Sequence, residues 1–168
     1  MQIRPYKSLD FDTIKTWITD ERSHALWCAD LIPYPLQKHI FEKTLKELSL
    51  KSNDTPFVAT NDDGVIVGFF CSAVNCSAKE GKLKFIIISP EFRGKGYGKK
   101  MVTLTVKNIF DNGLADIVQL NVFCNNERAK NCYLSVGFSE RSITKNAFCF
   151  NNEIWARCNM VIKNNLRK

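Results

Sequence analysis

The residues that build metal sites and disulfide frameworks are scarce or badly spaced in this chain of 168 residues. It has two histidines, and none of its seven cysteines forms a Cys-x-x-Cys pair. We therefore expect no structural zinc site and predict no metal ligands. Several cysteines lie inside apolar runs, where a free thiol behaves as a small hydrophobic group. This pattern favours a reducing compartment over a disulfide scaffold.

Long apolar runs and targeting signals are also missing. The chain begins Met-Gln-Ile-Arg-Pro, which lacks the hydrophobic core of a signal peptide. No apolar run approaches the roughly 20 residues that a membrane-spanning helix needs. We therefore expect a soluble, cytoplasmic protein with no membrane partner.

The charge balance is basic, with a formal net charge of +7. Such a balance suits a polyanionic ligand, either nucleic acid or a phosphorylated cofactor, although lysines spread over the surface also explain it. The lysines show neither interleaved aromatic residues nor a helix-turn-helix pattern, so no nucleic-acid partner is expected. The length and the 45% hydrophobic content are typical of one globular domain covering residues 1–168.

Hydrophobic periodicity predicts a mixed α/β domain around one central sheet. The predicted strands cover residues 1–5, 56–60, 65–74, 81–89, 117–123, 138–150 and 153–162. The spacing of apolar side chains predicts helices around residues 11–18, from 36 to about 51, and over 98–110. Two further helices are expected, a short one around 21–29 and one over 127–136. Ser8 is a candidate cap for the first helix. Gly113 and Gly137 are predicted to end the last two helices, because glycine adopts left-handed geometry without strain.

The stretch from Lys84 to Lys100 organises the chain. The aromatic and β-branched run 85–88 reads as a strand covered on both faces, and Pro90 ends it. The turn Arg93-Gly94-Lys95-Gly96-Tyr97-Gly98 follows, directly before a long helix. Glycines allow the backbone to approach a ligand, and a helix N-terminus offers unpaired N–H groups. Together with its basic side chains, this stretch predicts an anion site, most plausibly for a diphosphate.

Taken alone, this turn is moderately specific. It lacks the GxxxxGK[ST] pattern of a P-loop and the GxGxxG fingerprint of a dinucleotide site. An ordinary glycine-rich surface loop is the plainer alternative.

A second segment, Asn126-x-x-Ala129-x-x-x-Tyr133-x-x-x-Gly137-Phe138, makes the prediction more specific. The two segments together resemble the GNAT superfamily of acetyl-CoA-dependent N-acetyltransferases. The glycine turn resembles its acetyl-CoA signature, Arg/Gln-x-x-Gly-x-Gly/Ala, and the second segment resembles its other cofactor motif. Their separation and the order of elements also match, so the resemblance covers nearly the whole chain.

The resemblance implies a central, mostly antiparallel sheet, flanked by helices and splayed at the cofactor site. It implies acetyl-CoA as the acetyl donor. The pantetheine arm pairs with the strand end, the backbone N–H of Ile88 polarises the thioester carbonyl, and the glycine turn holds the diphosphate. The implied cofactor-binding residues are Ile86, Ile87, Ile88, Arg93, Gly94, Lys95, Gly96, Tyr97, Gly98, Lys99, Asn126 and Tyr133.

Two residues of the second segment carry specific roles. Tyr133 is the expected general acid that protonates the departing thiolate, although a tyrosine on an amphipathic helix is otherwise a core residue. Asn126 is predicted to cap its helix and also to hydrogen-bond the pantetheine arm.

The general base is unassigned. Many relatives carry a glutamate on the strand before the signature or on the strand before the asparagine cap, where this chain has Lys82, Lys84 and Asn121. The candidates are Glu80, Glu21, Asp30 and His24, each also explained as a surface charge, and deprotonation through ordered water is another route.

The acceptor pocket is expected from the N-terminal helices and the last hairpin. His24, Trp27, Tyr34 and Phe148 are the candidate lining residues, supported by Trp155, and core packing is an equal alternative for the tryptophans. Cys71 and Cys124 have no histidine partner in the sequence and are not favoured as nucleophiles.

The leading functional hypothesis is an N-acetyltransferase that moves an acetyl group to a primary amine of a small molecule or peptide, by direct attack in a ternary complex. The alternative is a sensor module of the same fold that binds CoA or acetyl-CoA without turnover, motivated by the missing carboxylate. The identity of the acceptor and the oligomeric state stay open, with a homodimer as one option.

Overall fold

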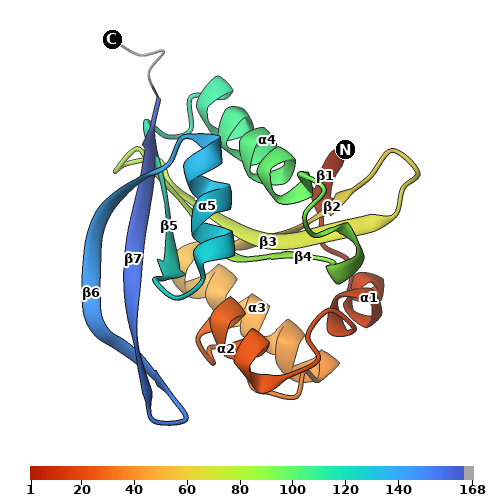
Figure 1. Cartoon of the computed structure of the whole chain (residues 1–168). Coiled ribbons are helices and arrows are strands. Elements are labelled where there is room, and N and C mark those ends of the chain that lie inside the picture. The colour runs from red at the N-terminus through yellow and green to blue at the C-terminus, as the bar shows by residue number, and fades with distance from the viewer. Residues whose placement is uncertain (165–168) are drawn as a thin grey trace. The chain divides into compact units, whose positions relative to one another are not determined.

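A computed structural model describes residues 1–164 of the chain (Figure 1). Within this range there are seven strands and five α-helices. The strands are β1 (Gln2–Pro5), β2 (Thr55–Thr60), β3 (Ile66–Asn75), β4 (Glu80–Ile88), β5 (Ile117–Phe123), β6 (Ser139–Phe150) and β7 (Glu153–Lys163). The helices are α1 (Phe11–Lys15), α2 (Glu21–Cys28), α3 (Lys38–Ser52), α4 (Tyr97–Asp111) and α5 (Glu127–Val136). None of these helices is long and apolar enough to cross a bilayer.

The strands follow the order β1-β2-β3-β4-β5-β7-β6, and the sheet is mixed. The β4–β5 pair is parallel, whereas β1–β2, β2–β3, β5–β7 and β6–β7 are antiparallel. This confirms the predicted mixed, mostly antiparallel sheet flanked by helices. The β4–β5 ladder joins 80–83 to 117–120, although both strands continue beyond it, which is where the resemblance places the splay.

The described chain divides into two compact units, each built from two stretches of sequence. Unit 1 comprises residues 1–73 and 84–101, and unit 2 comprises residues 74–83 and the chain from 102 onward. The chain therefore passes between the units three times. A single domain over residues 1–168 stays a prediction.

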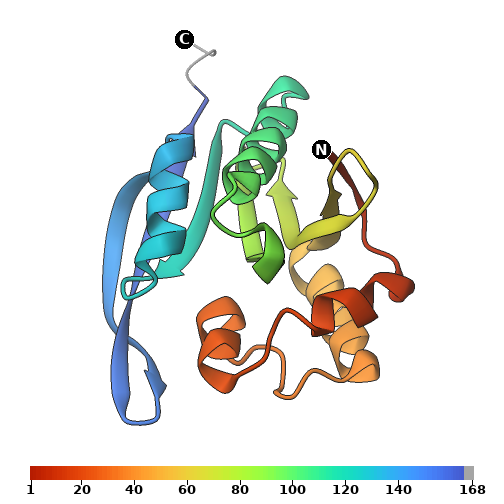
Figure 2. The same ribbon diagram turned by 45° about the vertical axis from the view of Figure 1, so that its right-hand side comes forward.

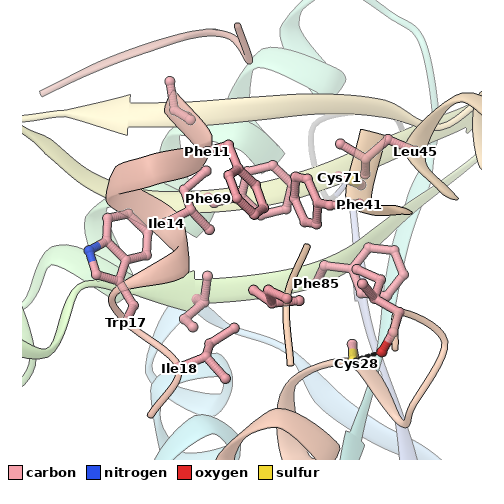
Figure 3. Packing of buried hydrophobic residues seen from close by; sticks show 14 residues of the cluster. Phe11, Ile14, Trp17, Ile18, Cys28, Phe41, Leu45, Phe69, Cys71 and Phe85 are labelled. Atoms are coloured by element: carbon pink, nitrogen blue, oxygen red, sulfur yellow. Dashed lines mark hydrogen bonds between the residues drawn. The ribbon is translucent and has the colours of Figure 1, made fainter. Parts of the chain in front are cut away.

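The core of unit 1 is aromatic. Helices α1, α2 and α3 lie on the same side of strands β2 and β3 (Figures 1 and 2). Phe41 of α3 packs against Phe69 of β3 with ring centroids 5.6 Å apart, and against Phe11 of α1 at 5.4 Å (Figure 3). Phe41 and Phe69 are fully buried, so helices α1 and α3 and strand β3 share one hydrophobic core.

The first predicted helix is shorter than its apolar spacing suggests. The spacing extends to Ile18, but α1 ends at Lys15, where i→i−3 hydrogen bonds tighten the last turn. Trp17 and Ile18 lie beyond the helix and are still buried. Their spacing therefore reports contact with the core rather than continued helix.

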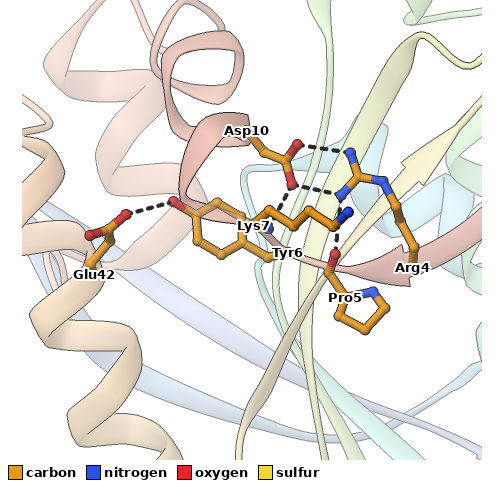
Figure 4. A network of polar contacts seen from close by, with 6 residues as sticks. All are labelled: Arg4, Pro5, Tyr6, Lys7, Asp10 and Glu42. Atoms are coloured by element: carbon orange, nitrogen blue, oxygen red, sulfur yellow. Dashed lines mark hydrogen bonds and ion pairs between the residues drawn. The ribbon is translucent and has the colours of Figure 1, made fainter.

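A polar network fixes the start of unit 1, and the predicted cap at Ser8 is wrong (Figure 4). The backbone N–H of Lys7 donates to the Asp10 carboxylate at 2.7 Å, and both terminal nitrogens of Arg4 donate to the same carboxylate at 2.7 and 2.8 Å. Burial alone would raise the pKa of Asp10, but these hydrogen bonds hold the pKa below its usual value. Asp10, not Ser8, is therefore the residue directly before α1, and its carboxylate holds the backbone of Lys7 ahead of the 3-10 turn Ser8–Asp10.

The turns and helix ends of unit 2 agree with the sequence. Gly113 and Gly137 have positive φ values of 66° and 110°, and each is followed by a 6→1 hydrogen bond that closes its helix. The β6–β7 hairpin turns at Asn151 and Asn152, both left-handed. Helix α5 runs alongside strands β5 and β7 (Figures 1 and 2).

Gly68 of β3 allows a close approach within unit 1. A Cβ atom at this position would lie 2.7 Å from Met101 Sδ, 2.8 Å from Ile88 Cδ1 and 3.2 Å from the Ile87 carbonyl oxygen. The strand can therefore pack against the end of β4 and the first turns of α4 only without a side chain.

We expect Gly68→Ala to lower the free energy of unfolding by about 1–3 kcal/mol, because the added methyl overpacks this contact. Gly81→Ala is the matched control, since its Cβ would lie no closer than 3.2 Å to any neighbour. Urea unfolding of both variants checks the prediction. An equal or larger loss at Gly81 would contradict it.

Candidate active site

The glycine turn after β4 has the backbone geometry of an anion site. Gly94 and Gly96 both have φ of +80°, a left-handed conformation that other residues adopt only with strain. Helix α4 begins at Tyr97, and its first i→i−4 bond runs from the Lys100 N–H to the Gly96 carbonyl at 3.0 Å. The amide groups before Lys100 thus belong to the first turn of a helix, where N–H groups lack intrahelical partners.

Of the basic side chains in this turn, one is hydrogen-bonded to the backbone and the others add positive charge. Arg93 folds back, with its Nε donating to the Ile88 carbonyl at 3.0 Å, so it braces the turn. Lys95 lies over the Phe92 ring at 5.7 Å, and Phe92 contacts Tyr97 edge-on at 5.2 Å. Lys99 and Lys100 are exposed on the first turn of α4 and add positive charge there.

The end of β4 directs its backbone groups to two edges. The Ser89 N–H donates to the Val67 carbonyl of β3 at 2.9 Å. Because backbone groups of successive strand residues point to opposite edges, the N–H and carbonyl of Ile88 face away from β3. The bond from Arg93 to the Ile88 carbonyl agrees with that direction.

Phe85, in the middle of β4, has a φ of +52°. A left-handed conformation is uncommon for any residue other than glycine and is a genuine outlier for a bulky aromatic residue. The Trp27 indole Nε1 donates to the Phe85 carbonyl at 2.8 Å. Nothing in the run Phe-Ile-Ile-Ile signals this irregularity, and the sequence analysis missed it.

Helix α5 in unit 2 carries the second motif. The Asn126 Oδ1 accepts from the Ala129 N–H at 3.2 Å, which confirms the predicted N-cap. Tyr133 is buried, and its ring packs on Phe138 at 6.2 Å between centroids. Burial, followed by the neighbouring Cys132, raises the pKa of Tyr133 well above its ordinary value, so its hydroxyl stays protonated at neutral pH.

Three of the four predicted lining residues come together in unit 1. The His24 ring lies 5.3 Å from the Tyr34 ring and 6.2 Å from the Trp27 ring, measured between centroids. Tyr34 is 38% exposed, Trp27 is half-buried, and His24 is only 1% exposed. The two more exposed rings are thus the better placed to meet a ligand.

His24 belongs to a buried cluster on α2. Its Nδ1 lies 3.4 Å from an Asp30 carboxylate oxygen, and its Nε2 lies 3.4 Å from the Cys28 sulfur. Burial lowers the pKa of His24, against the opposing effect of Asp30. Burial also raises the pKa of Cys28 to about 11, which leaves that thiol inert.

Phe148 lies in unit 2, in an aromatic cluster of the β6–β7 hairpin. Its ring centroid lies 5.3 Å from that of Phe123 and 5.4 Å from that of Trp155. The Trp155 indole N–H donates to the Glu153 carboxylate at 2.9 Å. Phe148 and Trp155 therefore support each other within the hairpin.

The carboxylates considered as bases are engaged or exposed. Glu80 lies at the start of β4, 3.4 Å from an Arg141 nitrogen, and so at the opposite end of that strand from Ile88. Glu21 is exposed on the first turn of α2. The sequence analysis missed a further carboxylate: Asp54, buried at 1% exposure, pairs with Lys84 at 2.6 Å.

Cys71, also fully buried, has its pKa raised chiefly by burial and is no nucleophile in this state.

Comparisons with known proteins agree with this geometry. Among curated proteins, a [ribosomal protein bS18]-alanine N-acetyltransferase of Haemophilus ducreyi is 28% identical over 120 residues, covering 71% of this chain and 75% of that protein.

Solved structures share the fold at low sequence identity. A spermidine N-acetyltransferase from Vibrio cholerae, in complex with CoA and spermine, superposes with a TM-score of 0.82 at 18% identity, covering 96% of this chain and 94% of that one. A ribosomal-protein-alanine N-acetyltransferase from Brucella melitensis superposes with a TM-score of 0.75 at 14% identity, covering 98% of this chain and all of that one.

The model of the acetyltransferase (GNAT) family matches residues 11–138, a span that contains both motifs. The resemblance inferred from those motifs is thereby confirmed. The chain belongs to the GNAT family of acetyltransferases and is an acyltransferase whose acetyl donor is acetyl-CoA.

Proposed function

We propose that this enzyme transfers the acetyl group directly to a primary amine while donor and acceptor are bound together. The observation that carries the proposal is the presence of both donor motifs within the family match over residues 11–138. The enzyme is proposed to work in the cytoplasm. A homodimer is the assembly to be tested by light scattering.

The residues of the glycine turn fit an acetyl-CoA diphosphate. Two left-handed glycines precede a helix N-terminus, and a Cβ at Gly96 would meet no atom within 4 Å, so the backbone is open to a ligand. In the proposal, residues 93–99 hold the diphosphate and Ile86 to Ile88 pair with the pantetheine arm. Asn126 adds a hydrogen bond to that arm from its capping position.

The proposed reaction needs one fixed donor and one acid. The Ile88 N–H donates to the thioester carbonyl oxygen, where negative charge builds as the amine attacks. The new N–C bond forms, the C–S bond breaks, and the sulfur leaves with the bonding electron pair. Tyr133 gives its hydroxyl proton to that sulfur, and the proton released by the amine passes to water and restores the phenol.

The acceptor that fits best is a peptide α-amine. A primary amine attacks only when uncharged, and at pH 7.5 roughly a third of α-amines are uncharged against about 0.1% of alkyl amines. Lysines 82 and 84 and Asn121 hold the positions where the family resemblance expects a carboxylate base. An α-amine needs least help from a base, and the Haemophilus ducreyi relative is named for an alanine acceptor. Trp27, Tyr34, His24 and Phe148 stay the proposed acceptor residues. The general base stays unassigned, with Glu80 as the candidate put forward for it.

Calorimetry with acetyl-CoA tests the donor half of the proposal. We expect saturable 1:1 binding, weakened at least about fivefold by Gly96→Ala, because a side chain at φ +80° is strained by about 1–2 kcal/mol. Gly64→Ala, at φ +81° in the β2–β3 turn, is the matched control and should bind normally. Absence of saturable binding to the unmodified protein would sink the proposal.

Thiol release tests the acceptor half. We expect faster turnover with a peptide bearing an N-terminal alanine than with spermidine at pH 7.5. The reverse order would overturn the α-amine proposal while leaving the transferase intact. Acetyl-CoA binding without thiol release across a broad panel of amines would instead favour a sensor module of the same fold.

A further inference from the structure

The irregularity at Phe85 requires something that holds it. A non-glycine residue in left-handed geometry persists only when its surroundings fix it. Phe85 lies directly before Ile86 to Ile88, the strand segment proposed to meet the donor. Its own side chain is buried, with an exposure of 6%, in the core of unit 1.

Trp27 supplies the fixing contact. Its indole Nε1 donates to the Phe85 carbonyl at 2.8 Å across 58 positions of sequence. The Trp27 ring also packs edge-on against the Phe85 and Phe69 rings, at 6.1 and 6.3 Å between centroids, and stacks on the Phe41 ring at 6.5 Å. The indole is thus held by three rings while its one polar group meets one backbone carbonyl.

Helix α2 is itself held at both ends, so Trp27 is presented rigidly. At its start, the Asp20 carboxylate accepts from the Ser23 N–H at 2.8 Å and from the Ser23 hydroxyl at 2.7 Å. At its end, Ala29 and Asp30 are left-handed, and Asp30 reaches back to His24. A helix of eight residues would otherwise be marginal.

We propose that Trp27 is a positioning residue that sets the direction of the Ile86 and Ile88 backbone N–H groups through the Phe85 carbonyl. Strand side chains and backbone groups alternate with a period of two, so the conformation at Phe85 decides which edge the following peptide groups face. The proposed function enters this inference at one point only: it assigns the Ile88 N–H its role as donor to the thioester carbonyl.

The test separates the hydrogen bond from the ring. Trp27→Phe removes the N–H and part of the ring. The sulfur isostere 3-benzothienylalanine, placed at position 27, removes the N–H and keeps the ring shape. Both are expected to lower kcat about tenfold, below the roughly 10²–10³-fold cost of deleting an oxyanion donor. Acetyl-CoA affinity should stay within about threefold, because the glycine turn is untouched.

Trp17→Phe is the control, since Trp17 is 5% exposed in the same core. A kcat loss in Trp17→Phe equal to that of the isostere would mean that core packing alone matters, and would overturn the proposal. Unchanged kcat in the isostere would overturn it as well.

Amide hydrogen exchange provides a readout that does not depend on acetyl transfer. The isostere should speed exchange at Ser89, whose N–H donates to the Val67 carbonyl at the end of β4, and leave Val58, a buried position on β2, unchanged. If the unmodified protein transfers no acetyl group at all, faster exchange at Ser89 still supports the brace. Unchanged exchange there overturns it.

Discussion

Tyr133→Phe is expected to lower turnover about 100-fold, at the lower end of what general acid catalysis contributes. The acetyl-CoA affinity should stay within about threefold, because the variant removes one hydroxyl from a buried ring. Burial raises the pKa of Tyr133 far above its ordinary value. The phenol is therefore always protonated at neutral pH. Because a raised pKa also makes it a weaker acid, the contribution of Tyr133 to the rate is limited.

The raised pKa also predicts the pH profile. An acid must be protonated to act, and a raised pKa moves loss of that proton to higher pH. Turnover by the unmodified enzyme should show no decline attributable to Tyr133 up to about pH 10, the ordinary tyrosine pKa.

Stopped-flow or thiol-release assays at saturating donor measure this effect. Tyr6→Phe is the matched control, because burial and then Glu42 also raise the pKa of the Tyr6 hydroxyl, which donates to Glu42 at 3.5 Å. That variant should keep turnover within about twofold of the unmodified enzyme. An unchanged rate in Tyr133→Phe would remove Tyr133 from the acid role.

Lys84→Met is expected to lower the free energy of unfolding by about 3–5 kcal/mol, because it leaves the Asp54 carboxylate buried without its counter-ion. The Asp54 side chain is 1% exposed, and the Lys84 ammonium lies 2.6 Å from it. Ser52 donates its hydroxyl to the same carboxylate oxygen at 2.9 Å. The other oxygen, Oδ1, is buried and has no hydrogen-bond partner among residues 1–164.

A double-mutant cycle decides whether the loss belongs to the pair. Lys84→Met combined with Asp54→Leu removes both charges and should recover most of the stability, since apolar groups often replace a buried pair without loss. The exposed Lys107–Asp111 pair on α4 is the control, and Lys107→Met should change stability by less than about 1 kcal/mol. A double variant as unstable as the single one would contradict the prediction. Chemical denaturation of the unmodified protein, the single variants Lys84→Met and Asp54→Leu, the double variant and Lys107→Met supplies the measurement.

The sequence predicted the parts of this fold that depend on local chemistry. Gly113 and Gly137 end their helices, Asn151 and Asn152 turn the last hairpin, and Asn126 caps α5. Each of these positions needs a conformation or a side-chain oxygen that few residues supply, so the residue type itself is the signal.

The features that escaped prediction depend on residues far apart in the sequence. Nothing local to Phe85 marks it as left-handed, because its conformation is matched to the Trp27 indole from another element. The pairing of Lys84 with Asp54 was not predicted, since the two residues lie 30 positions apart. The cap predicted at Ser8 is wrong for a local reason, because Asp10 is the residue that precedes α1 and its carboxylate pairs with Arg4.

The interleaving of the two units sets a condition on synthesis at the ribosome. Phe41 and Phe69 emerge within residues 1–73, but Phe85 and Ile87, which complete their core, follow only after the excursion through residues 74–83. At about 5–20 residues per second, the nascent chain spends roughly 1–6 seconds between residue 73 and residue 101. During that interval the aromatic residues of the unfinished core lack the side chains that complete their burial, and transiently exposed hydrophobic surface of this kind makes a folding chain prone to aggregate.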